Sequence, residues 1–184
     1  MRNAELTREK LLEAASEAFC ELGYSNASLR TIAKAASVDV ALISRYFGGK
    51  LGLFRATLER AFDWPEILDE ANDPFEVAIA KYAGAQTEAH QVSATRMIVM
   101  NANDPEAGDV LRAVLQACLI GPLQDRVGGP QAEERLAMFV SVVLGASMVR
   151  QSLKLPGMAA MSQDAYAAQL RYLIDAAIGF ERLE

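Results

Sequence analysis

The sequence has few of the residues that build metal centres, disulfide frameworks and nucleophilic sites: its 184 residues include two cysteines and one histidine. Cys20 and Cys118 both lie in apolar, helix-patterned surroundings, which predicts reduced core thiols of a cytoplasmic protein. His90 has no cluster of carboxylates or cysteines beside it, and a lone histidine is more often a surface or capping residue than a ligand. We therefore expect no metal site and no cofactor.

Signatures of catalysis are scarce as well. The chain lacks a glycine-rich phosphate loop, a G-x-S-x-G element and paired cysteines. Carboxylate pairs such as Asp69-Glu70 and Glu133-Glu134 fall at expected helix starts or on polar faces and are interpreted as solvated. These absences argue against an enzyme.

Long hydrophobic runs are also missing. The opening segment MRNAELTREK carries charge where the apolar part of a signal peptide would begin, so no signal peptide is expected. The longest apolar-rich stretch, Leu136 to Val149, is shorter than the roughly 20 residues that span a bilayer, and it includes Ser141, Gly145 and Ser147. The sequence predicts a soluble, cytoplasmic protein with no membrane partner.

The net charge of −6 at first argues against nucleic acid, but the charge is unevenly distributed. From Gly23 to Arg60 there are six basic and two acidic residues, a balance of +4. From Ala61 onward there are nine basic and seventeen acidic residues, a balance of −8. A basic segment joined to an acidic body is compatible with DNA contact through one end of the molecule.

What the sequence does contain is helical periodicity, with no useful run of strand-like alternation. We expect an all-α protein of about nine helices. The ranges are 7–22, with Thr7 as N-cap and Gly23 as terminator, then 28–36, 39–47 with Asp39 as N-cap, 50–64, 73–89, 93–101, 104–128 interrupted at Gly121-Pro122, 130–152 and 162–182.

Residues 28–47 predict two short helices joined by Ala36-Ser37-Val38, which is the layout of a helix-turn-helix. Ala33 and Ala36 supply the small side chains needed where the helices cross. Three apolar residues would anchor the second helix, and four residues would remain on its outward face and could enter a major groove. The anchors are Val38, Ile43 and Phe47, and the outward set is Val40, Ala41, Ser44 and Arg45.

The stretch TREKLLEAASEAFCELGYSNASLRTIAKAASVDVALISRYFGGKLGLF resembles the TetR-family DNA-binding domain along its whole length. The resemblance rests on the joint register of FCELGY from Phe19, the Ser28 cap, Ile32-Ala33, Tyr46-Phe47, and Lys50 with Leu53-Phe54. Farther on, NDPEAG, GPLQDRVGGP and LPG are similar to one of the family's C-terminal domain types. The resemblance implies a DNA-binding domain over residues 1–50 and a larger effector-binding and dimerisation domain over residues 51–184.

The resemblance also implies individual roles at DNA. Arg45 and Ser44 would face base edges, with Arg45 paired to a guanine, and Ala41 with Val40 would pack on a thymine methyl. Other residues would contact the sugar-phosphate backbone. These are the Tyr46 hydroxyl, the Lys50 ammonium, the main chain at Ser28, and Arg30, which could also reach a groove edge. Tyr46 could equally be an aromatic residue at the edge of the core, and both roles can hold together.

The chain departs from the family pattern at three places. Ser37 replaces the glycine usual in the turn, so serine either tolerates the backbone angle required there or is mildly strained by it. Ser44 stands where the family often has a tyrosine, which removes a phosphate contact. Gly48-Gly49 is more flexible than the usual linker.

The last two helices are apolar on more than one face, so one face can enter the core and another needs a second partner, which predicts a homodimer. Candidate interface residues are Val142, Ala146, Val149, Tyr166, Leu170, Leu173 and Ala177. A pocket for a small hydrophobic or amphipathic effector is expected between the central helices. Its candidate residues are Trp64, Tyr82, Met97, Met100, Leu115, Phe139 and Met148, although ordinary core packing explains each methionine equally well.

Together these patterns predict a repressor that a small molecule releases from a palindromic operator, where dimeric readers place their recognition helices roughly 34–36 Å apart. Activation in place of repression is a less favoured variant. A second hypothesis is a helical ligand-binding or scaffolding dimer whose head has lost useful DNA affinity. A third, weaker hypothesis is an all-helical enzyme.

Overall fold

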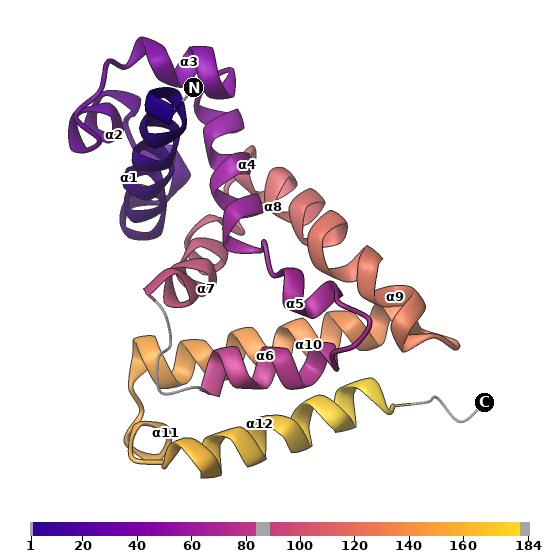
Figure 1. The fold of residues 1–184 in the computed structure, drawn as a ribbon. Coiled ribbons are helices and arrows are strands. Elements are labelled where there is room, and N and C mark those ends of the chain that lie inside the picture. Colours follow the sequence, from indigo (N-terminus) through magenta and orange to yellow (C-terminus); the bar gives the residue numbers. More distant parts are fainter. Residues whose placement is uncertain (1, 84–88, 181–184) are drawn as a thin grey trace. The chain divides into compact units, whose positions relative to one another are not determined.

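The computed structural model describes residues 2–83 and 89–180 and contains no strand in these ranges. It is all-α, as predicted, and Figure 1 shows the order of its helices. They are α1 (Arg2–Asn26), α2 (Leu29–Ala35), α3 (Ala41–Phe47), α4 (Lys50–Ala61), α5 (Pro65–Leu68), α6 (Pro74–Ala83), α7 (Ala89–Asn101), α8 (Ala107–Leu115), α9 (Gly121–Val127), α10 (Ala132–Ser147), α11 (Pro156–Ala159) and α12 (Gln163–Ile178), with π-helical segments η1 (Gln116–Ile120) and η2 (Met148–Leu153).

The predicted helices are present, with α8, η1 and α9 together forming the seventh and α10 with η2 the eighth. The structure adds two single turns, α5 and α11, which begin at Pro65 and Pro156. Proline suits a first helical position because its missing N–H would have no partner there. The parts of the predicted fifth and ninth helices at residues 84–88 and 181–182 lie outside the described residues.

The chain divides into two compact units. Unit 1 comprises Met1–Asp63 and Arg96–Leu115, and unit 2 comprises Trp64–Thr95 and Gln116–Glu184. Helix α7 contributes its first half to unit 2 and its second half to unit 1. The sequence predicts a different division, by function, into a DNA-binding domain over residues 1–50 and an effector-binding domain over residues 51–184. That division stays a prediction.

In unit 1, helices α1 and α4 pack against each other through large apolar side chains. The rings of Phe19 and Phe54 meet edge to face, with centroids 5.0 Å apart, and Tyr24 packs on Phe54 at 5.4 Å. Helix α1 starts well before Thr7, so the predicted N-cap at Thr7 is wrong, because the first residues continue the same helix. Gly23 has a φ of 74° and a non-helical ψ, which confirms that the regular helix ends there.

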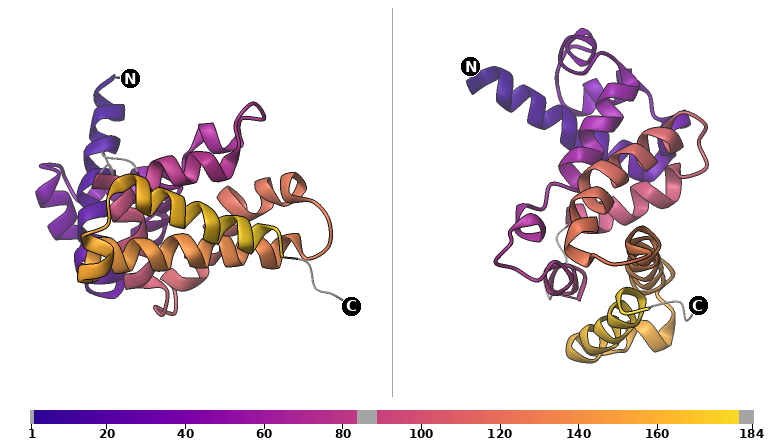
Figure 2. Two further views of the ribbon diagram at one scale, coloured as in Figure 1. Left: turned by 90° about the horizontal axis from the view of Figure 1, so that it is seen from below. Right: turned by 90° about the vertical axis from the view of Figure 1, so that its right-hand side faces the viewer.

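In unit 2, helices α6, α10 and α12 lie side by side around one apolar core (Figures 1 and 2). Tyr166, Leu170 and Ile174 recur every four residues along α12, and all three are buried in that core. From α10 the core receives Leu136, Phe139 and Val143. This is the periodicity of a helix with one face turned inward.

The helix that begins at Ala132 agrees with the predicted range of 130–152 to within two residues at each end. Segment η2 continues α10 without a break, so the helix runs to Leu153 and spans 22 residues with a mean hydropathy of 1.5. Among the described residues, this helix is long and apolar enough, by length and composition alone, to cross a membrane. The apolar-rich stretch expected from the sequence, Leu136 to Val149, is therefore too short, because the apolar helix extends from Ala132 to Leu153.

Candidate nucleic-acid interface

Helices α2 and α3 with their connecting turn form the predicted helix-turn-helix. Ser28 precedes α2 with extended backbone angles, but its hydroxyl makes no capping hydrogen bond within the described chain. Helix α3 begins at Ala41, two residues after the predicted cap. Asp39 still supports its start, because its carboxylate accepts a hydrogen bond from the Ala41 N–H at 2.7 Å.

The turn between the helices has a left-handed residue. Ser37 has a φ of 56°, the region in which glycine is the least strained residue. The main-chain N–H groups on either side of its Cα remain bonded within the turn: Ser37 donates to the Lys34 carbonyl at 3.1 Å and Val38 to the Ala33 carbonyl at 2.9 Å. The turn therefore keeps its hydrogen bonds while a serine occupies the position of the usual glycine.

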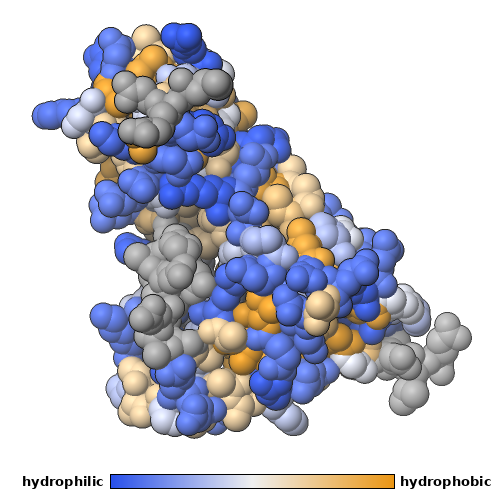
Figure 3. All heavy atoms as spheres, viewed as in Figure 1, coloured by the Kyte–Doolittle hydropathy of each residue, from blue (hydrophilic) through white to orange (hydrophobic). Residues whose placement is uncertain are grey.

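The two faces of α3 differ as the sequence predicts. Ile43 is completely buried, and Val38 and Phe47 are half-buried, so the anchoring residues face inward. The residues expected to face DNA are exposed, namely Ser28, Arg30, Val40, Ala41, Ser44 and Arg45. Much of the surface of unit 1 in the space-filling view is hydrophilic (Figure 3). Exposure makes these side chains available to a partner, and their contacts with DNA remain a prediction.

Tyr46 and Lys50 are half-buried rather than fully exposed. The Tyr46 ring meets the Phe47 ring edge to face, with centroids 6.4 Å apart. The Lys50 ammonium donates to the Ser25 carbonyl at 3.3 Å and lies 4.5 Å from the centre of the Tyr24 ring. Lys50 therefore connects the first turn of α4 to the end of α1, a packing role that its place in the sequence did not reveal.

Tyr24 is itself tied to a second element of unit 1. Its hydroxyl donates to the Glu106 carboxylate at 3.1 Å. Burial, together with this carboxylate, raises the pKa of Tyr24 to about 12, so the phenol remains protonated at neutral pH.

Arg8 is a cation near α3 that sequence reasoning missed. Its guanidinium lies 5.4 Å from the centre of the Phe47 ring, and its side chain is about half exposed. The helical pattern of α1 marks Arg8 as outward-facing but gives no sign that α3 lies beside it. The Arg8 guanidinium, 4.0 Å from the Glu9 carboxylate, thus lies at the C-terminal end of α3.

The candidate pocket residues are divided between the two units. Trp64, Tyr82 and Phe139 belong to the apolar core of unit 2, where the rings of Trp64 and Tyr82 meet at 5.8 Å. Met148 is half-buried at the start of η2. The other three candidates belong to unit 1: Met97 is buried, Leu115 is half-buried and Met100 is 48% exposed.

The candidate dimer residues divide between two faces of α12. Tyr166 and Leu170 are buried within their own unit, so the prediction that they lie on an interface needs correction. The sequence could not make this choice, because α12 carries apolar side chains on both faces. Leu173 is 46% exposed and Ala177 is half-buried, and both are on the outer side. On the preceding helix, Val142, Ala146 and Val149 are half-buried.

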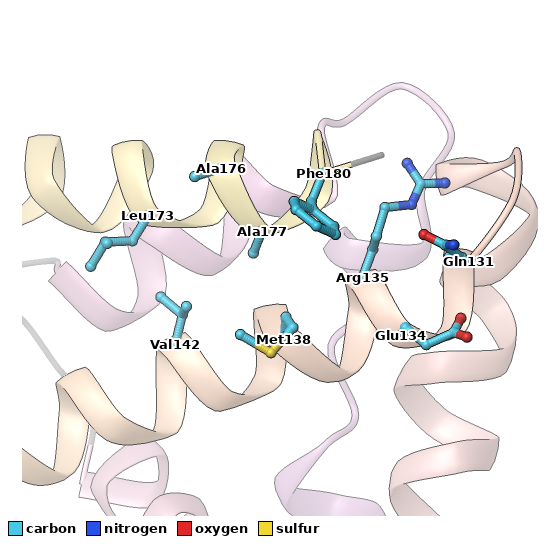
Figure 4. Close-up of a pocket in the computed structure, with 9 residues that line it drawn as sticks. All are labelled: Gln131, Glu134, Arg135, Met138, Val142, Leu173, Ala176, Ala177 and Phe180. Atoms are coloured by element: carbon cyan, nitrogen blue, oxygen red, sulfur yellow. The ribbon is translucent and has the colours of Figure 1, made fainter. Parts of the chain in front are cut away.

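A groove with a volume of about 470 Å³ lies between α10 and α12 (Figure 4). Val142 and Met138 line it from α10, and Leu173, Ala177 and Phe180 from α12 and the residues after it. Gln131, Glu134 and Arg135 lie at one end, and Ala176 completes the lining. Sequence reasoning missed Ala176 and Phe180, although their spacing of three residues from Leu173 and Ala177 could have identified them.

Among the described side chains, no group of three or more histidine, cysteine or acidic residues could hold a metal ion. The His90 side chain lies outside the described residues. Cys20 is buried and Cys118 half-buried, both as thiols.

Comparison with known proteins connects this architecture to a family. The family model described as "Bacterial regulatory proteins, tetR family" matches residues 11–57, which contain the helix-turn-helix. The model described as "Tetracyclin repressor-like, C-terminal domain" matches residues 73–178. Together the two models cover most of the chain.

Individual relatives agree with these matches. The probable HTH-type transcriptional regulator YttP of Bacillus subtilis is 42% identical over 57 residues, which are 31% of this chain and only 28% of that protein. The HTH-type transcriptional regulator BetI 2 of Chromohalobacter salexigens is 40% identical over 55 residues, 30% of this chain and 27% of that one. These matches concern the N-terminal part alone.

Solved structures extend the likeness to the whole fold. NalD, the secondary repressor of the MexAB-OprM multidrug efflux pump in Pseudomonas aeruginosa, has a TM-score of 0.71 at 21% identity, covering 95% of this chain and 97% of that one. A TetR-family regulator from Streptomyces coelicolor has a TM-score of 0.56 at 25% identity, covering 96% of each chain. With its helix-turn-helix, its helical C-terminal domain and both family models, this chain belongs to the TetR family and is a transcriptional regulator with a DNA-binding head.

Proposed function

We propose that this regulator is a cytoplasmic repressor that binds a palindromic operator as a homodimer and leaves it when a small molecule binds unit 2. The observation that carries the proposal is the outward face of α3, where four residues are exposed while Ile43 anchors the helix from behind. NalD, which has a similar fold, is a repressor, and this analogy favours repression over activation.

At the operator, Arg45 is the residue expected to read sequence. Its exposed guanidinium can donate two parallel hydrogen bonds to one guanine in the major groove. Ser44 would contact a neighbouring base edge, and Ala41 with Val40 would meet a thymine methyl. Backbone contacts would come from Arg30, Tyr46, the main chain at Ser28, and Lys50 to the extent that its bond to Ser25 leaves donors available.

The dimer interface is proposed to be the outer face of α10 and α12, which includes the groove in Figure 4. Met138, Leu173 and Phe180 are each about half exposed on this face, so apolar side chains are open to solvent there. A second copy would cover this face with the same residues, as a two-fold interface requires. Because the dimer would bury the apolar outer side of α10, no membrane is needed to explain why this helix is so apolar.

The effector is proposed to be a small hydrophobic or amphipathic molecule bound in the core of unit 2, near Trp64, Tyr82 and Phe139. Effector binding and operator binding would oppose each other through one coupling free energy, which acts equally in both directions. We expect no catalytic turnover of the effector.

Operator binding is tested by fluorescence anisotropy, using the DNA that flanks the protein's own gene at two salt concentrations. Wild type should bind more weakly at higher salt, because phosphate contacts release counterions. Arg45→Ala should lose about 5- to 150-fold of specific affinity, the equivalent of about 1–3 kcal/mol for a bidentate base contact. Arg112→Ala, which removes an exposed arginine from α8, is the matched control and should bind like wild type.

Equal loss in Arg45→Ala and Arg112→Ala would contradict the assignment of α3 as the reading helix. A folded dimer without salt-dependent binding to the flanking DNA would instead favour the ligand-binding or scaffolding hypothesis.

The interface is tested by sedimentation velocity. Leu173→Asp places a charge on the outer face of α12 and should convert dimers to monomers. Leu68→Asp is the control, because Leu68 and Leu173 are both 46% exposed and only Leu173 lies on the proposed face. A Leu173→Asp protein that remains dimeric would show that the interface lies elsewhere.

A further inference from the structure

The apolar core of unit 2 contains three hydroxyl groups that its packing does not explain. Thr95, Ser147 and Tyr166 are each no more than 2% exposed. None of their oxygen atoms has a hydrogen-bond partner in the described part of the chain. Buried polar side chains in folded proteins nearly always have a partner, so these hydroxyls are suited to a polar group from outside the chain.

The three hydroxyls come from three helices: Thr95 and Tyr166 lie beside Tyr82 of α6, and Ser147 lies beside Tyr166. Tyr82 is buried, and this burial raises its pKa to about 12. The nearby Thr95 hydroxyl lowers the pKa of Tyr82 as a hydrogen-bonding group, and the nearby Tyr166 raises it electrostatically. Tyr82 therefore lies beside both residues. The pKa of Tyr166 is also raised by burial, and the Ser147 hydroxyl opposes that shift. Thr95, Tyr82, Tyr166 and Ser147 thus form one continuous polar cluster, hereafter the hydroxyl cluster.

Both phenols of the hydroxyl cluster are hydrogen-bond donors at neutral pH, because a raised pKa keeps a tyrosine protonated. No carboxylate of the described residues contributes to either shift. The cluster can therefore offer donors without meeting a resident negative charge.

Arg150 places one fixed positive charge beside the hydroxyl cluster. Its guanidinium lies 4.2 Å from the centre of the Tyr166 ring. It is held there by hydrogen bonds to the carbonyl oxygens of Met158 at 2.9 Å and Met161 at 3.2 Å. These partners are neutral, and within the described ranges Arg150 has no carboxylate in ion-pair distance. A cation and several donors at the edge of an apolar core complement a carboxylate, whose burial requires both.

The surroundings suit an apolar body attached to that carboxylate. Tyr82 and Tyr166 belong to the same apolar cluster as Trp64 and Phe139. Met158 and Met161 pack against this cluster and are half-buried. Methionine side chains rearrange easily, so this side of the core can adapt to a guest molecule.

We propose that the hydroxyl cluster binds the carboxylate of a small apolar acid, with Arg150 compensating its charge and the apolar body lying in the core of unit 2. This inference rests on the proposed function, since it names the chemical class of the effector. It is specific to a carboxylate: neither an amine nor a neutral alcohol of the same body would satisfy Arg150 and the donors equally well.

The sole tryptophan of the chain provides the measurement. Trp64 packs on Tyr82 at 5.8 Å, so its fluorescence reports on changes next to the cluster. The full-length protein is titrated, without DNA, with decanoate, decanol and decylamine below their micelle concentrations. Decanoate should give saturable quenching or enhancement at the lowest concentration, decanol should bind more weakly, and decylamine should not bind.

Two conservative variants assign the signal to the cluster. Tyr166→Phe and Ser147→Ala should each weaken decanoate binding by about tenfold, the effect of one charge-assisted hydrogen bond. Their controls are Tyr172→Phe, on the exposed face of the same helix, and Ser141→Ala, an exposed serine of α10 whose hydroxyl bonds to the Ala137 carbonyl. The controls should bind like wild type. Without ligand, both cluster variants should melt close to wild type, because the hydroxyls they remove make no hydrogen bond of good geometry with the described residues.

Three results would overturn the proposal: no saturable decanoate signal, decanol or decylamine binding as tightly as decanoate, or unchanged decanoate affinity in both cluster variants. The first would mean that the hydroxyls bind only water. Decanoate binding and operator binding are tested independently, because the first is measured without DNA and the second without ligand. Operator binding without decanoate binding rejects only this inference, whereas decanoate binding without operator binding rejects the repressor.

Discussion

The side-chain oxygen of Asn101 accepts a hydrogen bond from the main-chain N–H of Tyr24, with the two atoms 2.5 Å apart. The same amide donates to the carbonyl oxygens of Met97 at 2.7 Å and Phe19 at 3.2 Å. Asn101 is completely buried. It therefore satisfies main-chain groups next to the kink at Gly23, where α1 leaves its regular hydrogen-bond pattern.

Replacing this asparagine should be costly. Asn101→Ala leaves the Tyr24 N–H and the Phe19 carbonyl in a buried site without their partner, so the free energy of unfolding should fall by about 3 kcal/mol. Urea denaturation at one fixed protein concentration measures the change, since the stability of a dimer depends on concentration. Asn103→Ala, at an exposed position in the following loop, should leave the unfolding midpoint unchanged. A loss below about 0.5 kcal/mol in Asn101→Ala would mean that water replaces the amide.

Helices α3 and α4 approach so closely at Gly52 that no side chain fits. A Cβ atom at this position would overlap the carbonyl oxygen of Phe47, the last residue of α3. Gly52→Ala should lower the free energy of unfolding by about 2 kcal/mol, typical of an overpacked site, because main chain must move. It should also weaken operator binding by displacing the end of α3. Gly157→Ala, where an added Cβ has no atom within 4 Å, should change neither property. Wild-type stability in Gly52→Ala would contradict this packing.

Asp104 makes the start of α8 sensitive to acid. Its carboxylate accepts hydrogen bonds from the N–H groups of Ala107 and Glu106 and from the Ser25 hydroxyl. The Ala107 N–H and then the Ser25 hydroxyl lower the pKa of Asp104. Because the folded-state pKa lies below the ordinary value of about 3.9, Asp104 stabilises the protein above roughly pH 4 and loses this effect as the pH falls through the lowered pKa.

Asp104→Ala should therefore cost about 1 kcal/mol at pH 7, the usual value of a helix cap. The difference from wild type should narrow at pH 2, when the wild-type carboxylate is protonated. Urea denaturation at both pH values tests this, with Asp125→Ala, an exposed carboxylate of α9, as control. A difference that is the same at pH 7 and pH 2 would exclude a role for the charge.

Arg135 holds three segments of unit 2 together. It is buried on α10 and donates to the carbonyl oxygens of Ile178, at the end of α12, and of Gly128, after α9. Arg135→Lys should lower the free energy of unfolding by about 2 kcal/mol, because a single ammonium cannot replace the forked guanidinium. Arg171→Lys is the control: Arg171 pairs with Glu76 at the surface, where the exchange should cost under about 0.5 kcal/mol. Similar losses in both variants would show that charge alone matters at residue 135.

The sequence predicted the helix-turn-helix well because its signals are local. The spacing of Ile32, Ala33, Ile43 and Phe47 determines which sides of α2 and α3 face inward, and the structure agrees on each. Cap positions shifted by one or two residues, as at Asp39 and Ala41, since a short polar side chain can support a helix start from more than one position.

By itself, the sequence determined the all-α class, the order of the helices and the outward face of α3, because helical periodicity and turn residues act over a few positions. Only the tertiary structure decided that Tyr166 and Leu170 face inward while Leu173 faces outward, since both faces of α12 are apolar. It also decided that Lys50 packs on Tyr24, that Asn101 bonds to the end of α1, and that Thr95 and Tyr166 lie beside the buried Tyr82. These contacts join residues far apart in the chain, and their energies depend on burial and distance, which no local pattern records.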